Sequence, residues 1–274
     1  MSVWLALAIA GAIECGAAAC PVELSGLEPS GTGATLISPE SGNTSEPSTF
    51  PMAYLERSPR HFLNAHEAWY KQGNARVAMG EHERAVEAYD RALAFNPNYG
   101  KAWHNRGVAL ATLGHFADAV ESYERAIALT PDRAVVWYHQ GIALIRLNRL
   151  PEAMISLERT LVLEPEHHLA ARNLGVTLFA LGRYDEALAA YDRALRFKPD
   201  YYQAWQNRGT ALMKLERTQE ALEAFDRVLR HQPEREAVWQ SRGDALSQLG
   251  RDRDAVAAYD RALELAPTLV SAWQ

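Results

Sequence analysis

The chain has 274 residues, 48% of them hydrophobic, and a net charge of −6. Residues 1–56 hold six acidic residues and no lysine or arginine, so residues 57–274 carry 28 basic and 28 acidic residues. A neutral main segment lacks the basic stripe that nucleic-acid binding requires, and we expect no nucleic-acid partner. The two cysteines, Cys15 and Cys20, precede this segment, which therefore needs no disulfide and no metal thiolate.

The first 56 residues read as two segments that precede the folded part. Residues 1–22 contain an apolar run over 3–13, which has signal-peptide rather than membrane-span length and no preceding Lys or Arg. Three interpretations stay open: a membrane anchor, a cleaved export signal, and a cytosolic tail or misassigned start. Residues 23–56 are rich in Ser, Thr, Pro, Gly and Glu, which predicts a disordered acidic linker. The expected localisation is cytoplasmic, or membrane-associated through residues 1–22.

Tryptophan recurs with a fixed period along residues 57–274. The spacings are 34 residues, or 68 where Ala171 takes the place of one tryptophan, and the residues are Trp69, Trp103, Trp137, Trp205, Trp239 and Trp273. If position 1 lies three residues before each tryptophan, six units follow: 66–99, 100–133, 134–167, 168–201, 202–235 and 236–269. Such a period predicts stacked supersecondary units rather than a single enzyme core.

Small residues and prolines recur at the same places in all six units. Position 8 is glycine: Gly73, Gly107, Gly141, Gly175, Gly209 and Gly243. Position 20 is alanine, as in Ala85 and Ala119, and position 32 is proline, as in Pro97 and Pro131. Apolar residues recur at helical spacing, which predicts two helices per unit, at about positions 2–14 and 18–30. We expect the two helices to approach closely at positions 8 and 20, with the large side chains at positions 4 and 24 beside them.

This pattern resembles the tetratricopeptide repeat family, in the variant with Trp-x-Asn-Arg-Gly-x-x-Leu that is associated with bacterial members. The resemblance implies an all-α fold, a right-handed α-solenoid of six stacked helix-turn-helix repeats and the start of a seventh, after a disordered N-terminal segment. It also implies a non-catalytic scaffold that binds another protein, with the first helices lining an inner, concave face.

The resemblance places a peptide-binding groove on positions 2, 5, 6, 9, 12 and 13 of the first helices. The candidate residues are Tyr70, Asn74, Lys101, His104, Asn105, Tyr138, His139, Arg146, Arg172, Asn173, Gln206, Asn207 and Lys214. Asn105, Asn173 and Asn207 share position 6, where a row of amides is similar to the asparagine ladder of the O-linked glycosyl-transferase repeats. Units two to five place basic residues and no acids at these positions, so we expect an extended acidic segment as ligand.

Outside this face, the charges at positions 25 and 26 recur in every unit and are expected on the outer surface. We expect pairs four residues apart on the second helix, such as Glu223–Arg227. Arginines at position 7 are expected to pair with acids at position 25 across a helix contact; they are Arg106, Arg208 and Arg242.

Catalytic and metal-binding motifs do not stand out. His167 and His168 lie in a turn and project differently, so we predict no metal site, no cofactor and no catalytic residue. One alternative stays open, because the chain begins a seventh unit at 270–274 and then stops: the repeats would be the substrate-recruiting arm of an enzyme that extends past residue 274. The uncapped C-terminal end could also take part in self-association.

Overall fold

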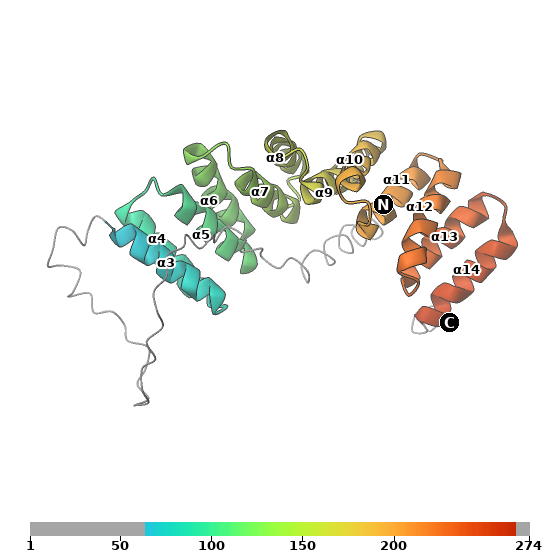
Figure 1. Cartoon of the computed structure of the whole chain (residues 1–274), viewed down its shortest axis with the longest axis horizontal. Coiled ribbons are helices and arrows are strands. Elements are labelled where there is room, and N and C mark those ends of the chain that lie inside the picture. The colour runs from blue at the N-terminus through green and yellow to red at the C-terminus, as the bar shows by residue number, and fades with distance from the viewer. Residues whose placement is uncertain (1–63, 267–274) are drawn as a thin grey trace, which may run out of the picture. The chain divides into compact units, whose positions relative to one another are not determined.

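The computed structural model describes residues 64–266, which form twelve α-helices and no strand (Figure 1). The helices are α3 (Ala65–Ala78), α4 (His82–Phe95), α5 (Gly100–Thr112), α6 (Phe116–Leu129), α7 (Ala134–Arg146), α8 (Leu150–Leu163), α9 (His168–Ala180), α10 (Tyr184–Phe197), α11 (Tyr202–Lys214), α12 (Thr218–His231), α13 (Glu236–Gln248) and α14 (Asp252–Leu265). The predicted N-terminal segments, 1–22 and 23–56, and the start of a seventh unit at 270–274 lie outside the described residues.

The helices follow one another as six hairpins, one for each predicted unit. Each helix from α4 to α13 packs against the helix that follows it, and first helices of neighbouring units also touch, as α5 touches α7. Contacts between units are therefore local in sequence, which is the property that defines a solenoid. The predicted all-α solenoid of six hairpins is confirmed.

Each hairpin turns through a residue with left-handed backbone. Four units use glycine, as at Gly114 with φ of 84° and Gly182 with φ of 77°. Asn148 and Glu216 take this place in units three and five, with φ of 57° and 59°. The next residue donates its N–H to a carbonyl five residues back in every turn, as His115 does to Leu110 at 2.9 Å. This bond and the positive φ form a Schellman-type end to each first helix.

The glycine at position 8 lies under the large side chain at position 24 of the same unit. A Cβ on Gly107 would lie 2.5 Å from Tyr123 Cε1, and one on Gly175 would lie 2.4 Å from Tyr191 Cε1. In unit three the neighbour is Leu157 instead, whose Cγ would be 2.9 Å from a Cβ on Gly141. The predicted close approach at position 8 is confirmed in all six units.

The periodic tryptophans tie each unit to the one before it. The indole Nε1 of Trp103 donates to the carbonyl of Pro97 at 2.8 Å, and Trp137, Trp205 and Trp239 bond the equivalent prolines at 2.7 to 2.9 Å. The proline follows the end of the preceding second helix, and the proline's own carbonyl has no hydrogen-bond partner within that helix. Tryptophan at position 4 and proline at position 32 thus form one junction.

Unit four lacks the tryptophan, and a different side chain bonds the junction carbonyl. The guanidinium of Arg193, at position 26, donates to the carbonyl of Pro165 through Nε at 3.2 Å and Nη2 at 3.0 Å. Nη2 also donates to the carbonyl of Leu161 at 2.9 Å. Arginine at position 26 therefore satisfies the carbonyl that the indole reaches elsewhere, beside the space left by Ala171.

Candidate interaction surface

The predicted inner face consists of side chains that the first helices carry at positions 2, 5, 6, 9, 12 and 13. Position 5 of one unit bonds position 6 of the next unit, 35 residues later. Asn105 Nδ2 donates to Tyr70 Oη at 3.1 Å, and Asn173 Nδ2 donates to Tyr138 Oη at 3.2 Å. His104 Nε2 and His139 Nδ1 form the rung between these two, at 2.9 Å. We call this series the inner ladder, because it joins units one to four across the face.

Two of the three predicted asparagines use their amides within the protein. Asn105 Nδ2 also donates to Asn74 Oδ1 at 2.9 Å, and Asn74 Oδ1 accepts a bond from Tyr89 Oη at 2.8 Å. Asn173 Oδ1 accepts from Arg172 Nη1 at 3.0 Å. An amide nitrogen has two hydrogens, so the Asn105 nitrogen has none left for a ligand.

Asn207 differs from the other two asparagines. Its Nδ2 is shielded from solvent and has no hydrogen-bond partner among residues 64–266. The pattern of the ladder explains this, because position 5 of the preceding unit is Arg172, and a guanidinium only donates. An unsatisfied buried donor is unfavourable, so this amide favours an acceptor from elsewhere.

The histidine rung carries no charge at neutral pH. The two rings stack at a centroid distance of 5.1 Å, and His104 is 8% exposed. Burial lowers the pKa of His104 to about 3, and the nearby His139 contributes to that shift. Burial likewise lowers the pKa of His139 to about 4, with a contribution from His167. The positive charge of the inner face therefore comes from lysine and arginine alone.

The remaining predicted residues are less constrained. Lys101, Arg146 and Lys214 are exposed, and the Arg146 guanidinium lies 4.6 Å from the ring centroid of Phe116. Gln206 is half-buried, and Arg172 is buried at 9% exposure. Apolar side chains lie between the basic ones and are partly buried against the core: Ile142, Ile145, Leu169, Val176 and Phe179. The face is thus basic and apolar in units two to five.

The outer charges fall into two groups. The predicted pairs between position 7 and position 25 of the preceding unit are confirmed, with Nε to Oδ1 distances of 2.6 to 2.7 Å: Arg106–Asp90, Arg208–Asp192 and Arg242–Asp226. The predicted pair Glu223–Arg227 does not form within residues 64–266. The Arg227 guanidinium lies instead over the Trp205 ring, 4.6 Å from its centroid, and Arg91 lies over Trp69 at 4.5 Å.

Sequence reasoning missed the inner ladder and the role of position 26. The ladder could have been found from the 35-residue offset between polar residues at positions 5 and 6. Position 26 is arginine in all six units, and this regularity signals a structural role that a purely solvated charge does not need.

The histidines of the described residues have structural surroundings rather than metal-binding ones. His167 caps α9, because its Nδ1 accepts the N–H of Ala170 at 3.1 Å. No group of three or more histidine, cysteine or acidic side chains within 64–266 is arranged to hold a metal ion. None of the helices α3 to α14 is both long enough and apolar enough to cross a bilayer.

Family models described as tetratricopeptide repeat match residues 70–134, 105–162, 138–202, 178–243 and 236–269. The chain belongs to the tetratricopeptide repeat family. Membership in this family implies a protein–protein interaction scaffold. No curated protein matches the sequence.

Solved structures of several repeat proteins share the fold. The crystal structure of MamA is 24% identical, with a TM-score of 0.59 over 61% of this chain and 91% of MamA. YrrB, described as a TPR protein with an unusual peptide-binding site, is 24% identical, with a TM-score of 0.59 over 65% of this chain and 95% of YrrB. PilF from Pseudomonas aeruginosa is 22% identical, with a TM-score of 0.62 over 75% of this chain and 94% of PilF. At these identities the likeness concerns the fold.

Proposed function

We propose that this protein is a non-catalytic scaffold whose inner face binds an extended, acidic segment of a partner protein. The observation that carries the proposal is the charge of that face. Residues 57–274 are neutral as a whole, yet units two to five place four basic residues and no acid at the inner positions: Lys101, Arg146, Arg172 and Lys214. Both histidines of the ladder are neutral at neutral pH, because burial lowers the pKa of each.

The apolar side chains between the basic ones restrict further which ligand sequences fit the inner face. Val176 and Phe179 are partly buried on the core and partly open, which suits an apolar ligand residue between acidic ones. Asn207 adds a specific anchor, because its Nδ2 has no acceptor within residues 64–266. This nitrogen is shielded from solvent, so Asn207 must change its rotamer to reach a carbonyl of the ligand backbone.

The peptide-binding description of YrrB is consistent with this proposal, since YrrB shares the fold. The hydrogen bonds of the inner ladder favour a binding surface that is already ordered in the free protein. Its bonds run from unit to unit and fix the side chains at positions 5 and 6 before any ligand arrives. A fixed surface loses less conformational entropy on binding, which favours affinity.

Titration calorimetry with a synthetic peptide that alternates glutamate and leucine tests the proposal. The expected result is saturable binding that falls at least tenfold when glutamine replaces glutamate in the peptide. Lys101→Gln combined with Lys214→Gln should weaken the complex to a similar degree, whereas Arg196→Gln, on a second helix, should not. Equal affinity for the charged and uncharged peptides would exclude an acidic ligand.

A further inference from the structure

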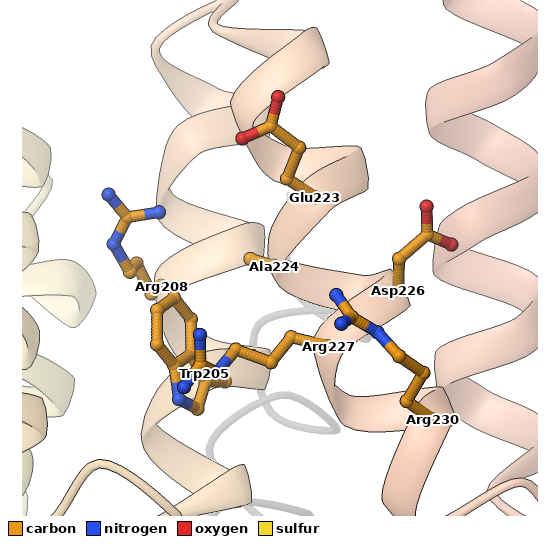
Figure 2. A pocket seen from close by; sticks show the side chains of 7 residues that line it. All are labelled: Trp205, Arg208, Glu223, Ala224, Asp226, Arg227 and Arg230. Carbon is orange, nitrogen blue, oxygen red and sulfur yellow. The ribbon is translucent and has the colours of Figure 1, made fainter.

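The fifth unit has a hollow that shares no position with the inner face. Its volume is about 460 Å³, within the range of ligand pockets, although it is open to solvent. Figure 2 shows the side chains that line it. The residues that shape it come from α11 and α12, at positions 4, 7, 22, 25, 26 and 29: Trp205, Arg208, Glu223, Asp226, Arg227 and Arg230. We call it the unit-five hollow.

Two of the five charged residues around the unit-five hollow are paired with residues outside it. Arg208 Nε donates to Asp192 Oδ1 at 2.7 Å, and Asp226 Oδ1 accepts from Arg242 Nε at 2.6 Å. Arg227 and Arg230 form no hydrogen bond or ion pair with any residue of 64–266. Glu223 also lines the hollow, and its carboxylate points away from both guanidinium groups (Figure 2). The hollow therefore contains two guanidinium groups without an ion pair among the described residues, and one of them, Arg227, lies over the Trp205 ring.

No other unit combines these features. Position 29 is Ala94, Ala128 and Val162 in the first three units, so those units have one arginine rather than two at positions 26 and 29. Unit four has Arg196 at position 29, but it lacks the tryptophan, and its other arginine, Arg193, bonds backbone carbonyls. In unit six, Glu264 at position 29 pairs with Arg261 at 2.7 Å. Among the described units, only unit five has two arginines at positions 26 and 29 that form no hydrogen bond or ion pair and that lie beside a tryptophan.

We propose that the unit-five hollow binds a phosphorylated side chain of a partner protein. Arg227 and Arg230 are three residues apart on α12, so their side chains leave the same face of the helix one turn apart. Each guanidinium offers up to five N–H donors and accepts none. A phosphate monoester carries nearly two negative charges and three acceptor oxygens, which match two guanidinium groups, whereas a single carboxylate matches one.

The test uses the whole chain and a short acetylated peptide with one phosphoserine, measured by titration calorimetry. The unphosphorylated peptide, the peptide with aspartate at that site, and inorganic phosphate are the comparison probes. The expected result is saturable binding of the phosphopeptide and at least tenfold weaker binding of the other three. Inorganic phosphate that binds as tightly as the phosphopeptide would overturn the proposal, because the site would then recognise the free ion.

Matched variants assign the binding to the hollow. Arg230→Ala should lower phosphopeptide affinity at least tenfold, and it should fold normally, because alanine occupies position 29 in units one and two. Arg227→Lys should also weaken binding, since it keeps the charge and loses the planar fork. Arg196→Ala, at the same position in unit four, should change nothing. The proposal is wrong if Arg230→Ala binds like Arg196→Ala, or if Lys101→Gln with Lys214→Gln removes the binding instead.

Discussion

The second and fourth units build the same hairpin but close their junctions with different groups. In the second unit the indole of Trp103 bonds the Pro97 carbonyl, and in the fourth the guanidinium of Arg193 bonds the Pro165 carbonyl, next to Ala171. Within each hairpin, by contrast, glycine lies under a tyrosine ring so closely that a Cβ added to Gly107 or Gly175 would lie only 2.5 or 2.4 Å from the ring's Cε1. The junction requires a donor for the carbonyl rather than one residue type, whereas the hairpin contact in both units leaves no room for a methyl group unless the tyrosine ring moves.

The rungs of the inner ladder also use different residue pairs for the same connection. The second and third units are joined by His104–His139, and the third and fourth by Tyr138–Asn173. Both histidines have pKa values below 6.5 in the fold, so the unfolded chain takes up protons first as the pH falls. Stability is therefore full above about pH 6.5 and falls as the pH drops toward 4, by about 2 kcal/mol for each histidine at pH 5.

Urea unfolding followed by circular dichroism at several pH values measures this loss. The matched variant is His104→Tyr with His139→Asn, which converts this rung into the tyrosine–asparagine type of its neighbours. We expect the variant to lose most of the pH dependence of stability between pH 6.5 and 4. A smaller dependence should remain because burial also lowers the pKa of His167. An unchanged pH profile in the variant would show that this rung is not the acid-sensitive element.

The hairpins should respond alike in the second and fourth units. Gly107→Ala and Gly175→Ala each place a methyl group inside a tyrosine ring contact, and we expect a cost of about 2–3 kcal/mol for both. Gly141→Ala should cost less, about 1 kcal/mol, because the Leu157 side chain can move away. Unfolding midpoints of the three variants check the order. A loss for Gly141→Ala as large as for Gly107→Ala would contradict the role of the ring.

The junctions should respond differently. Arg193→Ala removes charge-assisted bonds to two carbonyls, for an expected loss of about 2 kcal/mol. Arg125→Ala, the same change in the second unit, should cost less than about 0.5 kcal/mol, because Trp103 bonds the junction carbonyl there. Thermal unfolding of both variants measures the two losses of stability. If the two losses are equal, Arg193 does not stand in for the missing indole.

The smallest expected effects concern the turns. Gly114→Ala and Gly182→Ala should each lose about 1 kcal/mol, because both positions have positive φ. Glu216→Gly should gain a similar amount, since Glu216 adopts φ of 59° without the freedom of glycine. Differential scanning calorimetry of these variants gives the sign directly. A destabilised Glu216→Gly variant would mean that the Glu216 side chain contributes more than its backbone strain costs.

The sequence predicted the hairpins well because each is specified by residues within one unit. Close packing within a unit can be predicted from the recurring pair Gly107 and Tyr123. The left-handed turn can be predicted from Gly114, because glycine adopts positive φ easily. The pairs between Arg106 and Asp90 and their equivalents were also predicted, because they recur in phase. The unit boundaries follow from the same period.

The candidate site was harder to predict, because it depends on contacts between units. Asn105 looked available for a ligand, yet its two amide hydrogens go to Tyr70 and Asn74. The substitution of Arg193 for an absent tryptophan, and the place of Arg227 over Trp205, involve side-chain directions that a period does not specify. The sequence period therefore predicts on which face of a helix a residue lies, whereas its hydrogen-bond partners are known only from the structure.

Reversing the charge of the inner face tests its proposed role most directly. Lys101→Glu combined with Lys214→Glu would be titrated with two peptides of equal length, one alternating glutamate and leucine, the other lysine and leucine. If the basic inner face selects its ligand by charge, the wild-type protein will bind the acidic peptide and the double variant will prefer the basic one. The same preference in both proteins would contradict it.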